Sequence, residues 1–278
     1  MPHTDNLTAF SPLSPYALLT QEAMSALDTL VNQQGTDGLT LMRRAGAAVV
    51  KVIESAFPSP ASVLVLCGLG KNGGDGFIVA GLLQQKGWTV TCTVIGDVAQ
   101  LADTALQARA DFPGSLVAWS PELLGGCTLI VDALFGIGLN RPLSSEYEMV
   151  IQAVNESRQP VVSIDMPSGI HADTGAALGL AICAKTTVTF TRKKPGLLLL
   201  PGRIHAGEVI VADIGIEARV VATAISACAE NHPTLWHDQV PRFGVEQHKY
   251  HHGHALVLGG GVMTGAARLA ARAAQRTG

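Results

Sequence analysis

The residues with the clearest chemical potential form a glycine-rich run, CGLGKNGGDG, at positions 67–76. Glycines let a backbone approach a ligand closely, and the amides at the start of a following helix favour phosphate groups. Asp75 lies inside this run, where a carboxylate would repel an adjacent pyrophosphate. We therefore expect Asp75 either to cap the following helix or to bind a sugar hydroxyl. The GxGxxG spacing of dinucleotide-binding loops is satisfied by Gly68, Gly70 and Gly73.

Polar side chains also follow two later strand-like runs. Asp132 ends one apolar run and precedes a loop at 136–142, whereas Asp165 and Ser168 follow the next run. Because parallel strands end at the same edge of a sheet, we expect these groups to lie close together and near Asn72. Amide, carboxylate and hydroxyl oxygens without His or Cys suit an alkali or alkaline-earth cation rather than zinc. Each residue alone could equally cap a helix or form a turn.

The elements that must position these groups alternate between strand-like and helical segments from residue 62 onward. Continuous apolar runs rich in β-branched residues are typical of strands covered on both faces, hence of a mainly parallel sheet. Six strands are expected, at Val63–Cys67, Thr89–Ile95, Thr128–Leu134, Val161–Ile164, Thr186–Phe190 and Val209–Ala212. Helices are expected at Gly76–Gln85, about Ala99–Ala110 and Ser145–Ser157. The alternation predicts a doubly wound α/β fold with ligands near the carboxyl ends of the strands.

Two helices precede this alternation, and a shorter unit follows it. Thr20 can cap the first helix, and a second apolar stripe begins near Thr40. Residues 217–246 lack sustained periodicity, which is typical of a connecting segment. A strand in HALVLGGG (254–261) and a helix from about Gly265 then follow, and they cannot bury a core alone. We interpret the chain as one domain, a linker and the beginning of a second domain, at residues 1–216, 217–246 and 247–278.

Ser145 and Glu148 have the spacing of a capping box, which predicts the start of the helix at 145–157. Lys185, Lys193 and Lys194 are expected at the surface or as loop anchors, because the last two precede a Pro-Gly turn, and none is assigned to the site.

Composition narrows the class of protein. Hydrophobic residues make up 47% of the chain and charged residues 15%, against a usual charged share of about 25%, which excludes a disordered chain. The net charge of −3 argues against a nucleic-acid or anionic-membrane surface. We expect no membrane span and no export signal, because neither type of segment is visible. The five cysteines form no CxxC pair, so reduced thiols in a cytoplasmic protein are expected.

Several motifs occur in order between positions 17 and 216: LMRRAG, GKNGGDGF, VDALFGIGL, SIDMPSG and KKPGLLLLPGR. Together they resemble the NAD(P)H-hydrate epimerase family, the YjeF N-terminal domain. The tail that begins HKYHHGHALVLGGG resembles the opening of the ADP-dependent NAD(P)H-hydrate dehydratase domain, which has a ribokinase-like fold. The resemblance implies a bacterial bifunctional repair enzyme truncated early in its second domain. We therefore expect epimerisation by this chain, without ADP-dependent dehydration.

The resemblance implies a Rossmann-like three-layer α/β/α epimerase for the R and S forms of hydrated NADH and NADPH. In the full-length parent, a dehydratase that uses ADP or ATP would then restore the cofactor from the S form. Asp165 is the expected acid/base, with Asp132 second, and a homodimer or larger homo-oligomer is expected. A potassium ion would be held by Asn72, Asp132 and Ser168. The expected dinucleotide contacts are Lys71, Asn72, Gly73, Gly74, Asp75, Gly136, Ile137, Gly138, Leu139, Asn140, Arg141, Pro142 and Asp165.

Two positions depart from the family pattern. Lys71 stands where the family commonly has Asn, and Arg43 stands where Glu is common. Lys71 could still donate a hydrogen bond to a phosphate, whereas no role follows from the sequence for Arg43.

Two functions of other kinds remain open. An NAD(P)-dependent oxidoreductase would use the GxGxxG loop, with Asp97 at the ribose. It would also need a side chain that donates a proton to the substrate. The tyrosines that could do so, Tyr16, Tyr147 and Tyr250, are expected away from the strand ends. A non-catalytic dinucleotide- or partner-binding protein would not need the whole polar set. Catalysis is therefore favoured by the joint presence of Asn72, Asp75, Asp132, Asp165 and Ser168.

Overall fold

The chain divides into two compact units, Met1–Asn231 and His232–Gly278, which are described separately. The computed structural model describes residues 11–226, 228–240, 244–248, 251 and 253–277. The first unit continues past residue 216, where a linker was expected to begin. Part of that segment packs on the first unit, since α7 (Ala218–Val221) contacts α1 and β8 (Cys228–Ala229) pairs antiparallel with β1 (Ala17–Leu18).

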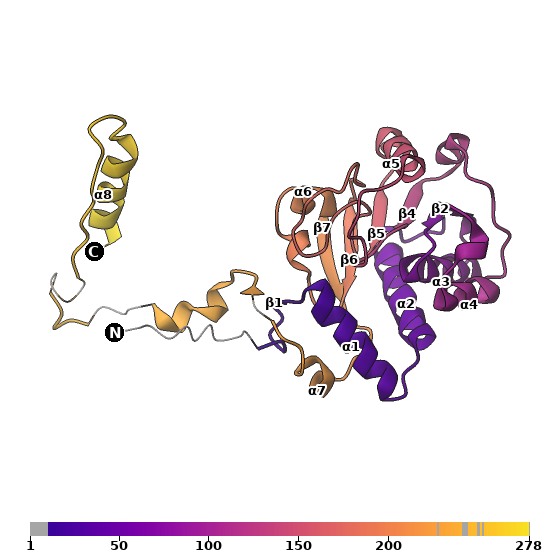
Figure 1. Ribbon diagram of the computed structural model, residues 1–278, viewed down its shortest axis with the longest axis horizontal. Helices are drawn as coiled ribbons and strands as arrows, with labels where there is room; N and C mark the ends of the chain where they lie inside the picture. The colour runs from indigo at the N-terminus through magenta and orange to yellow at the C-terminus, as the bar shows by residue number, and fades with distance from the viewer. Residues whose placement is uncertain (1–10, 227, 241–243, 249–250, 252, 278) are drawn as a thin grey trace. The chain divides into compact units, whose positions relative to one another are not determined.

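The centre of the first unit is a six-stranded sheet in which every neighbouring pair is parallel, in the spatial order β3-β2-β4-β5-β6-β7 (Figure 1). Each strand lies within one residue of its expected range, so the doubly wound α/β prediction is confirmed. The chain adds β3 on one side of β2 and then β4 on the other, which makes their carboxyl ends the switch point where such sheets bind ligands. The strands are β2 (Ser62–Cys67), β3 (Thr89–Val94), β4 (Leu129–Ala133), β5 (Val161–Ile164), β6 (Thr186–Phe190) and β7 (Glu208–Ala212).

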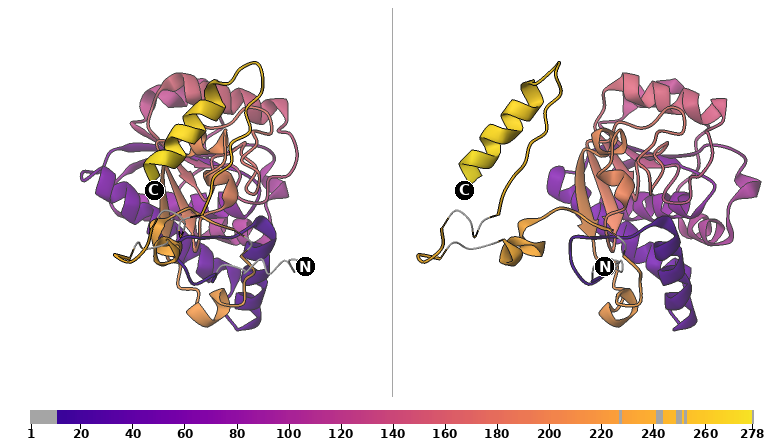
Figure 2. Two further views of the ribbon diagram at one scale, coloured as in Figure 1. Left: turned by 90° about the vertical axis from the view of Figure 1, so that its left-hand side faces the viewer. Right: turned by 60° about the vertical axis from the view of Figure 1, so that its left-hand side comes forward.

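Helices cover both faces of this sheet, which gives the three layers (Figure 2). Successive strand residues point to opposite faces, so Val63 and Val65 face one layer while Leu64 and Leu66 face the other. The first layer contains α1 (Gln21–Gln33), α2 (Gly38–Ala56), α3 (Lys71–Gln85) and α4 (Asp103–Asp111). The second contains α5 (Ser145–Ser157). Both faces are apolar, as the continuous hydrophobic runs predicted.

Side-chain caps start the first two helices. Thr20 accepts a hydrogen bond from the amide of Ala23, as expected, and Asp37 caps α2 slightly before the expected start near Thr40. The helix expected at about 99–110 is instead a short 3-10 turn at 98–100, followed by α4.

The capping box predicted for α5 is wrong. The N-cap is Ser144 rather than Ser145, and the cap makes no side-chain hydrogen bond. Glu148 turns away from the helix start, because its Oε1 accepts a hydrogen bond from the Leu180 amide at 3.4 Å. Its carboxylate therefore joins α5 to a loop that is distant in sequence.

The glycine-rich run differs most from its expected structure, because α3 begins at Lys71 rather than at Gly76. A methyl group on Gly73 would lie 1.9 Å from the carbonyl oxygen of Gly68. A methyl group on Gly68 would lie equally close, at 1.9 Å, to the carbonyl oxygen of Leu134 after β4. The first turn of α3 can therefore pack directly on the ends of β2 and β4 only without these Cβ atoms. Asp75 lies inside the helix, so the prediction that it caps the helix is wrong.

The second unit contains α8 (Gly265–Thr277), which begins at the expected residue. The strand expected within 254–261 does not form. A single strand has no partner for its amides and carbonyls, and the described part of this unit offers no second strand.

Two compositional expectations can be compared with the described residues. None of the described helices has the length and apolar character needed to cross a membrane. The five cysteines are free thiols, of which Cys67, Cys92 and Cys127 are buried, Cys228 is partly buried and Cys183 is exposed.

We expect Gly73→Ala to destabilise the first unit by about 3 kcal/mol or more, because its new methyl group would meet backbone that cannot rotate away. Gly125→Ala is the matched control, since a Cβ at Gly125 would meet open space, and its effect should stay within about 0.5 kcal/mol. Urea unfolding of the full chain followed by circular dichroism measures both. Equal midpoints for the two variants would contradict the close-packing argument.

Candidate functional site

A cavity of about 1110 Å³ lies at the carboxyl ends of β2, β3, β4 and β5. Its lining comes from the segments that follow these strands, from α1 and from the start of α3. Ligand cavities in proteins are commonly about 300–1,000 Å³, so this one is large enough for a ligand of cofactor size. The cavity therefore lies at the switch point of the sheet, where the strand order predicts a ligand.

Most of the expected dinucleotide contacts line this cavity. Those that do are Lys71, Asn72, Asp75, Gly136, Ile137, Gly138, Leu139, Arg141, Pro142 and Asp165. Gly73, Gly74 and Asn140 are not among the lining residues. Gly73 faces the Gly68 backbone and Gly74 faces Met42, so these two glycines permit packing rather than ligand contact.

The first turn of α3 brings Lys71, Asn72 and Asp75 to the cavity. The first amides of a helix have no acceptor within it and carry the positive end of the helix dipole, so this position favours an anion. Lys71 Nζ lies 3.8 Å from Asp28 Oδ2, and the lysine side chain is 69% exposed. An exposed positive charge therefore lies at the helix end that favours an anion.

Asp75 is half-buried among other carboxyl groups. Burial is the main cause that raises the pKa of Asp75 well above its ordinary value, and the charges of Asp165 and Asp28 add to it while Lys71 opposes it. Burial likewise raises the pKa of Asp28. The neutral form of Asp75 is thereby favoured, and a neutral carboxyl does not repel a phosphate.

Asp132 is fully buried at the end of β4 and joins two strand ends. Its Oδ1 accepts from Ser168 Oγ at 2.5 Å and the Leu134 amide at 3.3 Å, while its Oδ2 accepts from Ser163 Oγ at 2.7 Å and the Ser168 amide at 2.9 Å. A carboxylate has about four acceptor positions, so these donors use them all. Burial raises the pKa of Asp132, although the Ser168 and Ser163 donors oppose the shift. The role of Asp132 as a ligand of a cation stays a prediction.

Asn72 and Asp165 converge on Gly136. A methyl group on Gly136 would lie 3.2 Å from Asn72 Oδ1 and 3.1 Å from Asp165 Oδ2, so this glycine lets both oxygens face one small space. Asn72 Nδ2 is buried and has no hydrogen-bond partner within the described part of the chain. Since buried polar groups normally have a partner, the pair indicates a place for a ligand or an ion.

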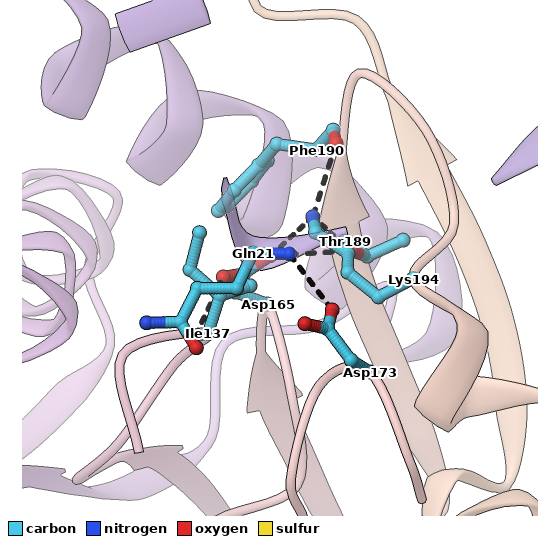
Figure 3. A network of polar contacts seen from close by, with 7 residues as sticks. All are labelled: Gln21, Ile137, Asp165, Asp173, Thr189, Phe190 and Lys194. Carbon is cyan, nitrogen blue, oxygen red and sulfur yellow. Dashed lines mark hydrogen bonds and ion pairs between the residues drawn. The ribbon is translucent and has the colours of Figure 1, made fainter. Parts of the chain in front are cut away.

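Asp165 follows β5 in the left-handed region, with φ 67°. A non-glycine residue there is strained, and such strain concentrates at functional sites. Its backbone amide donates to the Val188 carbonyl at 2.7 Å. Its Oδ2 accepts from the Ile137 amide at 3.3 Å, and its Oδ1 accepts from Lys194 Nζ at 2.6 Å and Thr189 Oγ1 at 3.1 Å (Figure 3). The carboxylate is therefore held on both sides at the cavity wall.

Two of these residues correct the sequence predictions. Lys194 was expected at the surface or as a loop anchor, but it is fully buried and its Nζ binds Asp165. Tyr147 was expected away from the strand ends, but it lines the cavity and its hydroxyl donates to the Ile95 carbonyl at 2.9 Å, just after β3. Both contacts join distant parts of the chain, so no local pattern could reveal them. Tyr250 lies outside the described residues.

Arg43 and Asp97 have local structural partners. Arg43 Nη2 binds Asp111 Oδ2 at 2.7 Å between α2 and the end of α4, with both side chains about half exposed. Such exposed ion pairs contribute about 0–1 kcal/mol, which gives Arg43 a modest structural role. Asp97 lines the cavity, and its Oδ1 accepts a hydrogen bond from the Ala99 amide at 2.9 Å.

Comparison with known proteins identifies relatives of the first unit. The model of the family described as "YjeF-related protein N-terminus" matches residues 38–196. An NAD(P)H-hydrate epimerase of Limosilactobacillus fermentum is 43% identical over 199 residues, which cover 70% of this chain and 95% of that protein. A bifunctional NAD(P)H-hydrate repair enzyme, Nnr, of Coxiella burnetii is 36% identical over 261 residues, which cover 91% of this chain and 52% of that protein.

The chain spans about half the length of the bifunctional relatives it matches. Among solved structures, the crystal structure of yeast ynu0 superposes with a TM-score of 0.57 at 23% identity, covering 64% of this chain and 82% of that one. That likeness supports the three-layer α/β fold. On the extent of the family match and its similarity to the Limosilactobacillus protein, the chain belongs to the family of YjeF-related protein N-termini.

Proposed function

We propose that this chain epimerises the hydrated forms of NADH and NADPH, in the repair of damaged nicotinamide nucleotides. The observation that carries the proposal is Asp165, whose strained backbone and two-sided hydrogen bonding hold its Oδ2 at the wall of a cofactor-sized cavity. Relatives named as NAD(P)H-hydrate epimerases match most of the chain. A fixed carboxylate is the type of group that moves a proton in such a reaction.

The reaction inverts a carbon that carries both a hydroxyl and the ring nitrogen. In one route, Asp165 protonates the hydroxyl, the C–O bond breaks as water leaves, and the nitrogen lone pair forms a C=N bond. Water then adds to the other face and returns its proton to Asp165. In the other route, Asp165 takes the hydroxyl proton as the C–N bond breaks, gives it to the nitrogen, and the ring recloses after rotation. Either route returns every proton and leaves the redox state unchanged.

The cavity offers different surroundings to the two parts of a dinucleotide. The amide end of α3 and the exposed Lys71 favour the pyrophosphate, and the raised pKa of Asp75 lessens the repulsion from its carboxyl. Ile137 and Leu139 supply apolar surface from the loop beside Asp165, which suits a nicotinamide ring. The hydrated carbon would then lie near the carboxylate that moves its proton.

A potassium ion fits the chemistry of the oxygen groups beneath this cavity. Asn72 Oδ1 faces the space at Gly136, and an amide oxygen can bind a cation. We propose that Asn72, Asp132 and Ser168 hold the ion, for which Asp132 or Ser168 must exchange a present hydrogen bond. The ion would supply positive charge that orders the loops after β4 and β5.

The proposal includes three statements that rest on sequence expectation. The chain is proposed to act in the cytoplasm and as a homodimer or larger homo-oligomer. Dehydration that uses ADP or ATP is proposed for the longer bifunctional form, in which epimerisation would supply the S form.

We expect Asp165→Asn to lower the rate of NADHX epimerisation by about 100- to 10,000-fold, because an amide cannot exchange the proton. Dinucleotide binding should change little, since the amide keeps the shape of the side chain. Chromatographic separation of the R and S epimers after mixing with each protein measures the rate, and calorimetric titration with NADH measures binding. Unchanged turnover would contradict the assignment, and oxidation of NADH by the unsubstituted chain would favour an oxidoreductase.

Epimerisation should be faster in potassium chloride than in choline chloride of equal ionic strength, because choline is too large for an oxygen-lined cation site. Asn72→Ala should reduce this difference between the salts. The same separation of epimers measures both proteins. Equal rates of the unsubstituted chain in the two salts would contradict a functional potassium site.

Asp75 should make the chain less stable as pH rises. Its pKa is raised in the folded state, so the folded chain binds more protons than the unfolded chain above about pH 4, and stability falls from there until the folded-state pKa is passed. Asp75→Asn should therefore flatten the fall in the free energy of urea unfolding between acidic and neutral pH. Glu208→Gln, which replaces an exposed carboxyl on β7, is the control and should keep the same fall in unfolding free energy. Parallel curves for Asp75→Asn and the unsubstituted chain would contradict the shift.

A further inference from the structure

Lys194 is a buried charged side chain for which the proposed reaction has no role. Its side chain is 1% exposed, and Nζ donates to Asp165 Oδ1 at 2.6 Å, Thr189 Oγ1 at 2.7 Å and the Phe190 carbonyl at 3.2 Å (Figure 3). A lysine ammonium has three hydrogens, so each has an acceptor. Thr189 Oγ1 in turn donates its hydrogen to the same Asp165 oxygen at 3.1 Å. This directional arrangement requires a charged lysine and an Asp165 Oδ1 that only accepts.

The two oxygens of Asp165 consequently have different surroundings. Oδ1 accepts from Lys194 and Thr189 at the inner side of the site. Among the described residues, Oδ2 accepts a single and longer hydrogen bond, from the Ile137 amide at 3.3 Å, and it faces Gly136, which lines the cavity. A proton-transfer oxygen must direct a lone pair at the substrate, and Oδ2 is the oxygen whose position allows this.

The backbone on both sides of this ion pair is strained. Asp165 and Thr191 are non-glycine residues with φ 67° and φ 64°. Their amides donate to the carbonyls of Val188 and Ala212, at 2.7 and 3.0 Å, so the neighbouring strands hold both residues in place. Strain of this kind persists only where the surrounding structure enforces it, and it is typical of functional sites. Here it turns the chain after β6 so that Lys194 returns to the end of β5.

We propose that Lys194, with Thr189, is a positioning residue that directs Asp165 so that Oδ2 exchanges the proton with the substrate. The inference rests on the proposed epimerase function. In either route the proton moves between Oδ2 and the substrate, while the ammonium keeps its three hydrogens. Lys194 forms and breaks no bond to the substrate; it sets which carboxylate oxygen reacts and balances the charge of that carboxylate inside the protein.

The test compares Lys194→Met with Lys193→Met in the full chain. Lys193 is the neighbouring lysine, and its Nζ pairs with Glu230 at 2.8 Å instead of with the site. We expect Lys194→Met to lower kcat for NADHX epimerisation by about 100-fold, with KM and the Kd for NADH changed by less than about 3-fold. Lys193→Met should keep kcat within about 2-fold of the unsubstituted value.

A rescue experiment separates positioning from simple support of the fold. Lys194→Ala leaves out the aminopropyl part of the side chain, which propylammonium can replace beside Asp165. We expect propylammonium to restore kcat in a saturable way without changing Tm, whereas tetramethylammonium, which has no N–H to donate, should not restore it. Restoration by both cations, or by neither, would overturn the positioning role.

Thr189→Val keeps the test decisive if the Lys194 variants fail to fold. It removes one donor to Asp165 Oδ1 and keeps the shape of the strand residue. We expect it to lower kcat by about 10-fold with Tm nearly unchanged, and an unchanged kcat would overturn the inference. An unsubstituted chain that does not epimerise NADHX would overturn the proposed function itself, whereas an active chain with an unaffected Lys194→Met variant would overturn only the role of Lys194.

Discussion

The close approach of α3 to the ends of β2 and β4 is the constraint on which the site depends. A Cβ on Gly73 would overlap the backbone of Gly68, and a Cβ on Gly68 would overlap the backbone of Leu134 after β4. Because the helix begins there, its amide end and the side chains of Asn72 and Asp75 reach the cavity. A helix starting one turn later would leave the same residues in a loop, without the dipole and without fixed directions. Glycine at these positions therefore determines the electrostatics of the cavity as well as its shape.

The segments after β4 and β5 are held together by a buried carboxylate, whereas the contact of α3 with the sheet depends on glycines. Asp132 accepts four hydrogen bonds from the segments after β4 and β5, and burial alone would make an unpaired carboxylate there very unfavourable. This network holds the Ser168 turn directly after Asp165. The strained conformation of Asp165 can persist because its own amide and the neighbouring turn are both held. Asn72, which follows β2, and Asp165, which follows β5, thus direct their side-chain oxygens at the same space beside Gly136.

Sequence patterns were sufficient for the sheet but only partly for the site. The six strands follow from continuous apolar runs, because burial on both faces dictates residue type at every position. The start of α3 did not follow, since glycine predicts a loop locally and only its tertiary contact with Gly68 permits a helix. Lys194 was misjudged for a related reason. A lysine before Pro-Gly is ordinarily exposed, and its burial depends on Asp165, which lies on another strand end. The sequence motifs identified the polar residues that follow each strand. Which of these residues contact one another became clear only from the three-dimensional structure.

Asp75 and Asp165 line one cavity but have different charged neighbours. Asp165 has an ammonium partner, whereas Asp75 is half-buried beside other carboxyl groups, and these surroundings favour its neutral form. The two are linked, because the charge on Asp165 is one cause of the raised pKa of Asp75. Lys194 holds the Asp165 carboxylate in place through its hydrogen bond to Oδ1. The raised pKa of Asp75 lessens its repulsion of a phosphate, while the hydrogen bonds of Asp165 leave Oδ2 facing the cavity. Burial remains the main cause of the raised pKa of Asp75, and the buried ion pair adds to it by fixing the position of the Asp165 carboxylate.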